Sequence, residues 1–146
     1  MHQAALEMHA NPPCGDIRRL LQNARTVAVV GCSVKPFRQS HVVSKAMHRR
    51  GLRMIPVNPT YEGDSLWGEQ VFARLSDIRE PIDIVNVYRR SEFTPDVARD
   101  AVSAGAKALW LQLGVKNEEA AAIASEAGLL VVQDLCLAVA HTMLIE

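Results

Sequence analysis

The sequence predicts an α/β fold, a single domain in which helices cover both faces of a doubly wound, five-stranded parallel sheet. Three apolar runs, at residues 52–57, 108–113 and 129–132, each begin directly after a glycine that ends a helix-like segment. Two further runs, at residues 27–30 and 82–88, complete the set of strands. Nearly every residue in these runs is apolar, as is typical of parallel strands that are buried on both faces. The regular alternation of helix and strand therefore favours a parallel sheet.

Helix-like spacing of apolar residues places helices between these strands. Asp16 is expected to cap the first helix and Ser40 the second, because both side chains accept hydrogen bonds from backbone N–H groups. The helices are expected at residues 16–24, 40–50, 94–104, 117–127 and 137–144. Residues 1–15 are predicted to be a flexible N-terminal lead-in, and residues 16–146 are predicted to form the folded domain.

The order of the strands in the sheet follows from the doubly wound arrangement. We expect the spatial order 82–88, 52–57, 27–30, 108–113 and 129–132. Residues 58–81 form a long connection for a compact domain, and they include several aromatic residues. This segment is therefore predicted to form a short helix or turn that packs over the sheet.

Composition excludes several classes of protein. The 146 residues carry no net charge, which argues against nonspecific nucleic-acid binding. No apolar run is long enough to span a membrane, and the first residues lack the pattern of a signal peptide. The three cysteines are an odd number without close spacing, as expected in a reducing compartment, and no His and Cys residues have metal-ligand spacing. We therefore expect a cytoplasmic protein without a metal, nucleic-acid or membrane partner.

Basic charge is concentrated in one part of the chain. No Asp or Glu lies between Asp16 and Glu62, and this interval holds nine of the 16 Lys and Arg residues. It surrounds a turn at residues 31–39, where a strand ends and a helix begins, and where backbone N–H groups and the helix dipole favour anions. Such a field suits a small polyanion, for example the phosphate chain of a nucleotide. Because Lys35 and Arg38 lie in the turn itself, we expect both to contact the ligand.

Ligands of doubly wound sheets bind beyond the carboxyl ends of the strands. The residues delivered to that edge are 31–38, 58–59, 89–91, 113–115 and 134–136. Gly31 and Gly114 would allow the backbone to approach a ligand closely there.

A nicotinamide dinucleotide is the first alternative ligand. Its fingerprint requires glycines at positions 31, 33 and 36, but the chain has Gly31, Ser33 and Pro36. The acidic residue that would hold the ribose after the second strand is replaced by Asn58. Because both halves of the fingerprint fail, NAD(P) binding is the weaker hypothesis.

Five segments, read in order, resemble the small CoA-binding protein family. They are GCSVKPFRQS, GLRMIPVNPTYEG, PIDIVNVYRRSE, GAKALWLQLGVKNEEAA and AGLLVVQDLC. The members of this family are similar to the CoA-binding domain of succinyl-CoA synthetase alpha subunits. The resemblance covers residues 16–136, and it implies a cytoplasmic, single-domain, Rossmann-like fold that binds coenzyme A or an acyl-CoA without established catalysis of its own.

The resemblance also implies a set of ligand-binding residues. Gly31, Cys32 and Ser33 would line the turn around the pyrophosphate, and Lys35 and Arg38 would pair with phosphates. The other residues assigned to the site are Ser40, Asn58, Pro59, Tyr88, Arg89, Arg90, Gly114 and Val115. No catalytic residue and no metal ligand are assigned.

The chain departs from the family pattern at a few positions. Cys32 stands where the family turn usually has alanine, and Gln39 stands where proline is usual. Leu135, Ala140 and Met143 replace residues that are usually charged, so the C-terminal region has fewer charges than the pattern predicts. The phosphate turn keeps its Gly, Ser, Lys and Arg.

Cys32 supports a second hypothesis about chemistry. A thiol at the start of a helix, beside Lys35 and Arg38, would have a lowered pKa and could form a mixed disulfide with CoA. The alternative is that Cys32 only replaces a small buried alanine.

The sequence thus favours a small, non-catalytic binding or regulatory module over an enzyme. No histidine has an evident carboxylate partner, and the synthetases take their phosphorylatable histidine and ATP-binding partner from other domains. The alternatives are an NAD(P)-binding enzyme and an acyl-CoA-handling enzyme subunit that needs a partner. Apolar residues in the last segment would allow a homodimer.

Overall fold

A computed structural model describes residues 10–145 and confirms the α/β fold. Most of the predicted N-terminal lead-in, residues 1–9, lies outside the described residues. The helices are α2 (Cys14–Asn23), α3 (Gln39–Arg49), α4 (Thr94–Ser103), α5 (Glu118–Glu126) and α6 (Leu137–Leu144). The strands of the main sheet are β1 (Thr26–Val30), β2 (Arg53–Val57), β5 (Ile84–Val87), β6 (Ala108–Leu111) and β7 (Leu130–Val132). All neighbouring strands of this sheet are parallel.

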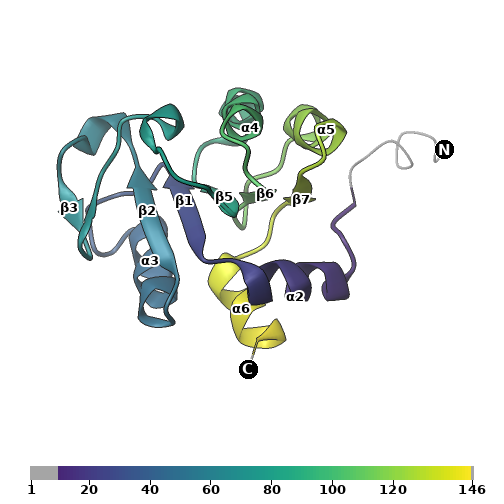
Figure 1. Cartoon of the computed structure of the whole chain (residues 1–146), viewed down its shortest axis with the longest axis horizontal. Helices are drawn as coiled ribbons and strands as arrows, with labels where there is room; N and C mark the ends of the chain where they lie inside the picture. Colours follow the sequence, from purple (N-terminus) through teal and green to yellow (C-terminus); the bar gives the residue numbers. More distant parts are fainter. Residues whose placement is uncertain (1–9, 146) are drawn as a thin grey trace.

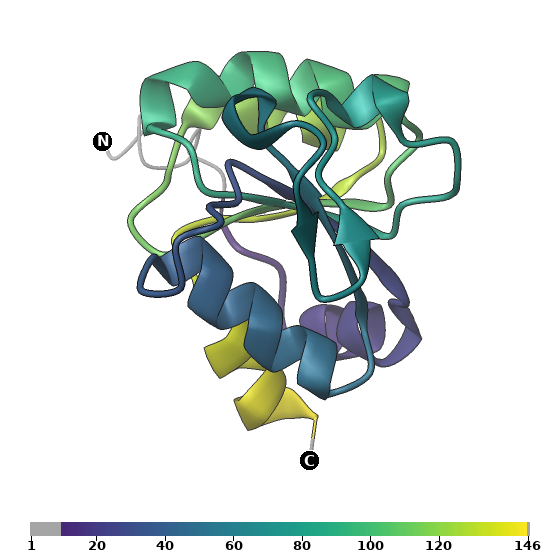
Figure 2. The same cartoon turned by 90° about the vertical axis from the view of Figure 1, so that its left-hand side faces the viewer.

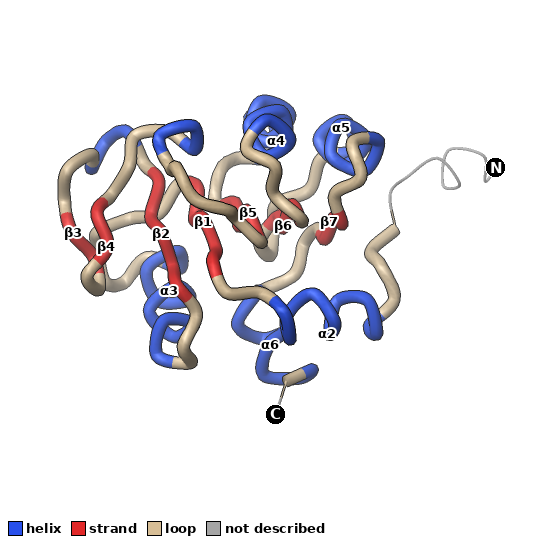
Figure 3. Tube along the Cα trace, in the orientation of Figure 1, coloured by secondary structure: helices blue, strands red, loops and turns tan. Residues whose placement is uncertain are grey.

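The sheet lies between two layers of helices (Figure 1, Figure 2). Helices α4 and α5 cover one face, and α2, α3 and α6 cover the other. In β1, Ala28 and Val30 pack toward the α4 and α5 face, whereas Val27 and Val29 pack toward the opposite face. Because both faces are covered, the strands are apolar on consecutive residues, as the sequence predicted. Figure 3 shows the strands running through the centre of the domain between the helices.

The predicted strand order is wrong at one position. The observed order is β2-β1-β5-β6-β7, so the strand at residues 84–87 pairs with β1 and not with the outer side of β2. The Asp83 carboxylate accepts hydrogen bonds from the Arg25 and Thr26 amides, at 2.7 and 3.0 Å, at the start of β1. The Asp83 amide in turn donates to the Thr26 carbonyl at 2.9 Å. These bonds hold the start of β5 against β1, and the outer side of β2 is covered by other residues.

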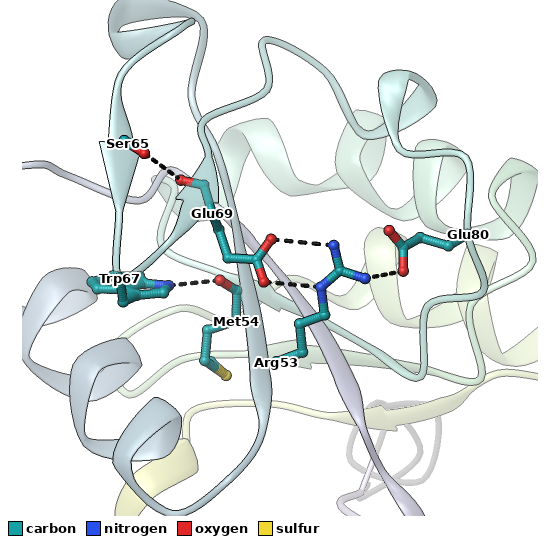
Figure 4. A network of polar contacts seen from close by, with 6 residues as sticks. All are labelled: Arg53, Met54, Ser65, Trp67, Glu69 and Glu80. Atoms are coloured by element: carbon teal, nitrogen blue, oxygen red, sulfur yellow. Dashed lines mark hydrogen bonds and ion pairs between the residues drawn. The ribbon is translucent and has the colours of Figure 1, made fainter.

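Residues 58–81 cover that outer edge of β2. They form the 3-10 turns η1 (Pro59–Tyr61) and η2 (Leu75–Asp77) and a short hairpin of β3 (Ser65–Leu66) and β4 (Glu69–Gln70). Figure 4 shows how the hairpin is attached: the Trp67 indole N–H donates to the Met54 carbonyl at 2.7 Å, and Arg53 contacts both Glu69 and Glu80. The exposed backbone of an edge strand would otherwise be free to pair with another chain. The segment therefore packs over the sheet as predicted, at its edge.

At the other edge of the sheet, the side chain of Asn11 forms the two hydrogen bonds that a neighbouring strand would otherwise form. The side-chain oxygen of Asn11 accepts from the Gln133 backbone N–H at 2.7 Å, and its side-chain NH₂ donates to the Gln133 carbonyl at 2.9 Å. Gln133 directly follows β7. One side-chain amide thus satisfies both backbone groups of the residue at this edge.

The predicted helix caps are partly wrong. Helix α2 begins at Cys14 after Pro13, so Asp16 lies in its first turn, where it pairs with Arg19. Helix α3 begins at Gln39, so Ser40 lies inside the helix. The predicted start of α5 is confirmed, because the Asn117 side chain accepts from the Ala120 amide at 2.8 Å.

Asp83 gives the sheet a stability that depends on pH. Partial burial by itself would raise the pKa of the Asp83 carboxyl, but the Arg25 and Thr26 amides and the Lys107 ammonium outweigh it and leave the pKa lowered. A lowered pKa in the folded state means that the carboxylate stabilises the fold above the unfolded-state pKa, and that this stability is lost as pH falls through the folded-state pKa.

We therefore expect Asp83→Asn to lower the free energy of unfolding by about 2 kcal/mol at neutral pH, since hydrogen bonds to a charged acceptor are removed. The difference from wild type should shrink at a pH below the lowered pKa of Asp83, where the wild-type carboxylate becomes protonated. Urea unfolding at both pH values measures it. Asp64→Asn, at an exposed carboxylate without a side-chain partner in the described chain, is the control. A difference that stays constant with pH would contradict the assignment.

Candidate functional site

Gly31 directly follows β1, at a crowded point of the sheet's carboxyl edge. Its amide donates to the Val57 carbonyl at 2.8 Å, and its φ angle is +88°. A Cβ atom at this position would lie 2.6 Å from the backbone oxygen of Tyr88. Only glycine combines this left-handed conformation with so close an approach to the neighbouring strand.

Asn58 fixes the loop that follows. Its side-chain amide donates to the Cys32 carbonyl at 3.0 Å and accepts from the Thr60 amide at 3.0 Å. Its own backbone amide donates to the Phe72 carbonyl at 2.8 Å. One residue thus joins the β1–α3 loop, residues 31–38, to the turn after β2 and to the segment that covers the sheet edge.

Residues at the start of α3 also form hydrogen bonds with the β1–α3 loop. The Ser33 amide donates to the Ser40 hydroxyl at 3.0 Å, and the Ser33 carbonyl lies 3.1 Å from Nδ1 of the buried His41. The first intrahelical bonds of α3 are those from the His41 and Val42 amides to the Arg38 carbonyl. The amides of Gln39 and Ser40 precede these bonds, so the positive end of the helix faces this loop.

Two pockets meet above this loop and form what we call the carboxyl-edge cleft. The larger has a volume of about 710 Å³, and the smaller has a volume of about 350 Å³. They share Gly31, Asn58, Thr60 and Tyr88. The larger pocket is further lined by Val30, Val57, Pro59, Ala73, Arg74, Leu75, Ser76, Arg89, Val97 and Asp100, and the smaller by Ser33, Arg38, Gln39, Ser40 and Tyr61.

Arginines give the cleft its charge. Arg38 lines the smaller pocket, and Arg74 and Arg89 line the larger one. Within residues 10–145, Arg38 and Arg89 form no ion pair, and their guanidinium groups stack on Phe37 and Phe93 at 5.9 and 5.1 Å from the ring centroids. Their charge is therefore available to an anionic ligand.

Asp100 is the carboxylate in the lining of the larger pocket. Its pKa is raised, first by partial burial and then by the neighbouring charge of Asp96. Burial and the negative neighbour thus both disfavour the charged form of this carboxyl group.

The structure brings most of the predicted site residues together. Eight of them line the cleft: Gly31, Ser33, Arg38, Ser40, Asn58, Pro59, Tyr88 and Arg89. Lys35 and Arg90 are exposed near it but line neither pocket, and Cys32 is buried behind the loop. Sequence reasoning missed Thr60, Tyr61, Arg74, Ser76 and Asp100. The signal available for most of them was their place in the 58–81 connection, which directly follows a strand end.

Gly114 and Val115 belong to a separate turn. The Gly114 amide donates to the Asp134 carboxylate at 2.8 Å, and the Asp134 amide donates to the Val115 carbonyl at 3.1 Å. A Cβ atom at Gly114 would meet no atom within 4 Å, in contrast to Gly31. The role of Gly114 in this structure is to close the turn between β6 and α5, and neither residue lines the cleft.

The environment of Cys32 contradicts the hypothesis of a reactive thiol. Its side chain is fully buried. Burial raises the pKa of the Cys32 thiol to about 12, and the nearby Ser44 hydroxyl lowers it only in part. Because desolvation outweighs the helix end and the basic loop, Cys32 is a protonated core residue.

The sequence and the fold of this chain both match known proteins. Residues 25–142 match the family described as "CoA binding domain". The chain belongs to this family. It is 46% identical over 133 residues to the uncharacterized protein YneT of Bacillus subtilis (strain 168), covering 91% of this chain and 97% of that protein.

Solved structures of other proteins share the fold of this chain. The structure of cell-free ID.343 from Thermus thermophilus has a TM-score of 0.88 and 35% identity, and the match covers 92% of this chain and 100% of that one. A hypothetical protein from Pyrococcus horikoshii OT3 has a TM-score of 0.86 and 32% identity, covering 94% and 99%. Acetyl-coenzyme A synthetase 1 of Ca. Korarchaeum cryptofilum, at 23% identity and a TM-score of 0.69, shares the fold over 86% of this chain and 30% of its own.

The described part of the chain contains neither a membrane-spanning helix nor a cluster of metal ligands. No helix within residues 10–145 is both long and apolar enough to cross a membrane. Over the same residues, no group of His, Cys, Asp and Glu side chains is arranged to hold a metal ion.

Gly31 and Gly114 form a matched pair for testing the crowded strand ends. Their φ angles are +88° and +86°, so alanine strains the backbone equally at both positions. We expect Gly114→Ala to lower the free energy of unfolding by about 1–2 kcal/mol. Gly31→Ala should cost at least about 2 kcal/mol more, because backbone atoms must also move apart. Urea unfolding measures both, and equal costs would contradict the close approach to Tyr88.

The thiols should differ sharply in reactivity. Cys14 is exposed, and Cys32 and Cys136 are buried. We expect a thiol reagent such as Ellman's reagent to modify Cys14 rapidly in the native protein, and all three cysteines only after denaturation. Peptide mass spectrometry identifies the modified residue, and Cys14→Ser should abolish the rapid phase. Rapid native modification of Cys32 would restore the hypothesis of a reactive thiol.

Proposed function

We propose that the protein binds coenzyme A or an acyl-CoA in the carboxyl-edge cleft, as a small non-catalytic binding or regulatory module of the cytoplasm. The observation that carries this proposal is the meeting of two arginine-lined pockets at Gly31 in a chain of the CoA binding domain family. Pockets of this size accommodate nucleotide-sized ligands.

The chemistry of the cleft fits CoA. The ligand carries a pyrophosphate and a 3′-phosphate, so it needs several cationic or N–H donors at separate places. Arg38 and the amides at the start of α3 would serve one group of phosphate oxygens, and Arg74 and Arg89 would serve another. Gly31 has no side chain and lines both pockets, so a phosphate chain could approach its backbone closely.

The hydrogen bonds of the Asn58 side chain argue against binding of a nicotinamide dinucleotide. An acidic side chain at this position would have to hold the ribose diol, but the Asn58 amide is engaged with the Cys32 carbonyl and the Thr60 amide. The same residue that stabilises the cleft is therefore unavailable for the contact that dinucleotide binding requires.

The side chains around the cleft support binding more than catalysis. Cys32 is protonated and buried, and burial also raises the pKa of the Tyr88 hydroxyl well above its usual range. Nδ1 of His41 lies against the Ser33 carbonyl. These groups hold the loop in place, and a nucleophile with a poised base would need the opposite properties.

Isothermal titration calorimetry tests the proposal directly. We expect CoA to bind wild type, and dephospho-CoA and NAD to bind more weakly, because each lacks the 3′-phosphate. Arg38→Ala and Arg89→Ala should each weaken CoA binding about tenfold, corresponding to the loss of a charge-assisted hydrogen bond.

Arg49→Ala is the matched control for these variants. Arg49 is an exposed arginine on α3 that lines neither pocket, so its removal changes the net charge equally without changing the cleft. Equal weakening by all three variants would mean that CoA responds only to overall charge. Absence of CoA binding to wild type would refute the proposed function, and tighter binding of NAD would favour the dinucleotide alternative.

A further inference from the structure

The two helix layers carry opposite charge. Helices α4 and α5 contain five carboxylates and one arginine within their bounds. Helices α2, α3 and α6 contain one carboxylate, Asp16, and four Lys and Arg residues, and Arg50 follows α3 directly. Although the chain has no net charge, the α4 and α5 layer is acidic and the α2, α3 and α6 layer is basic.

The basic layer also exposes apolar side chains. Val42 on α3 and Val139 and Met143 on α6 have 48%, 51% and 71% of their surface exposed. The two helices lie side by side (Figure 2). Arg50 joins them by donating to the Ala138 carbonyl at 3.1 Å. The α3–α6 surface, as we call the outward side of these helices, thus carries exposed apolar groups as well as the exposed cations Lys45 and Arg49. In the acidic layer, α4 and α5 expose no large apolar side chain over their described residues.

We propose that the α3–α6 surface docks a partner protein whose own surface combines exposed apolar side chains with carboxylates. Exposed Met and Val side chains favour a surface that excludes water, and Met and Arg are enriched at protein interfaces. Lys45 and Arg49 on the outer side of α3 form no ion pair within residues 10–145. Carboxylates of a partner are the complementary groups for these cations.

A second copy of this chain is a poorer fit. Two α3–α6 surfaces related by a twofold axis would bring two basic surfaces together, without carboxylates to pair with Lys45 and Arg49. The acidic layer of another copy has the required charge, but its helices lack exposed apolar groups to meet Val139 and Met143. The complementary surface therefore belongs to a different protein.

The α3–α6 surface adjoins the carboxyl-edge cleft without being part of it. The β1–α3 loop, which carries Arg38, leads into α3, and Val42 lies in the first turns of the same helix. None of Val42, Lys45, Arg49, Val139 and Met143 lines either pocket of the cleft. A docked partner would thus stand beside the ligand, and changes to the α3–α6 surface leave the ligand-binding residues intact.

The test uses a synthetic amphipathic helix with a leucine stripe bordered by glutamates, labelled for fluorescence anisotropy. We expect it to bind wild type with an affinity that falls as salt is raised. The double variant Lys45→Glu with Arg49→Glu should weaken binding at least tenfold, and Val139→Ser with Met143→Ser should do the same. A peptide with the same stripe bordered by lysines should not bind.

A matched variant separates local from overall charge. Arg79→Glu with Lys116→Glu changes the net charge equally at exposed residues outside α3 and α6, and it should leave the affinity within twofold. Circular dichroism shows whether each variant keeps its fold. Equal weakening by the two charge variants, or equal binding of both peptides, would overturn the proposal.

Two further outcomes would also overturn it. Binding to phosphatidylserine vesicles without binding to the acidic peptide would assign the surface to a membrane. Self-association in analytical ultracentrifugation that disappears in Lys45→Glu with Arg49→Glu would assign it to a second copy. CoA titration of the same variants is an independent measurement, so failure of the peptide test leaves the proposed function unaffected.

Discussion

Three strand ends meet at Gly31, and the site depends on how closely they meet. The Gly31 amide is bonded to the end of β2, and the Tyr88 amide, after β5, donates to the Val30 carbonyl at 2.8 Å. Asn58 adds a side-chain bond across the same junction. Because these bonds join loops to strands that are already in register, the cleft is formed before any ligand arrives. The backbone of a rigid sheet edge, more than any mobile side chain, gives the site its shape.

The sequence predicted the elements of this fold well because their signals are local. Apolar runs and glycine-ended helices depend on neighbours in the chain, and all five strands lie within a few residues of their predicted positions. The strand order was wrong because it depends on distant contacts. Asp83 reaches the amides before β1, and Trp67 occupies the free edge of β2, but nothing in either residue type indicates its partner. Hydrophobic periodicity shows that a strand is buried, not beside which strand it lies.

The site residues at strand ends were predictable from the sequence, whereas those further into the irregular 58–81 connection were not. Residues at strand ends, such as Arg38 and Arg89, reach the cleft because topology delivers them there. Arg74 and Ser76 reach it through an irregular connection, whose path no periodic pattern describes. Gly114 was predicted to lie in the site because it follows a strand, but it belongs to the turn between β6 and α5 and does not line the cleft. The pKa of Cys32 was misjudged because its sequence neighbours are cationic, whereas its burial decides the outcome.

Trp67 ties the covered sheet edge to the loop that shapes the cleft. Its ring lies 5.2 Å from that of His41, which holds the Ser33 carbonyl, and 6.4 Å from that of His48. Trp110, by contrast, is fully buried in the sheet. Because the Trp67 ring contacts His41, which in turn contacts the Ser33 carbonyl, a displacement of the loop would change the surroundings of the Trp67 indole and so its fluorescence. The protein therefore contains an optical reporter of the cleft within its own fold.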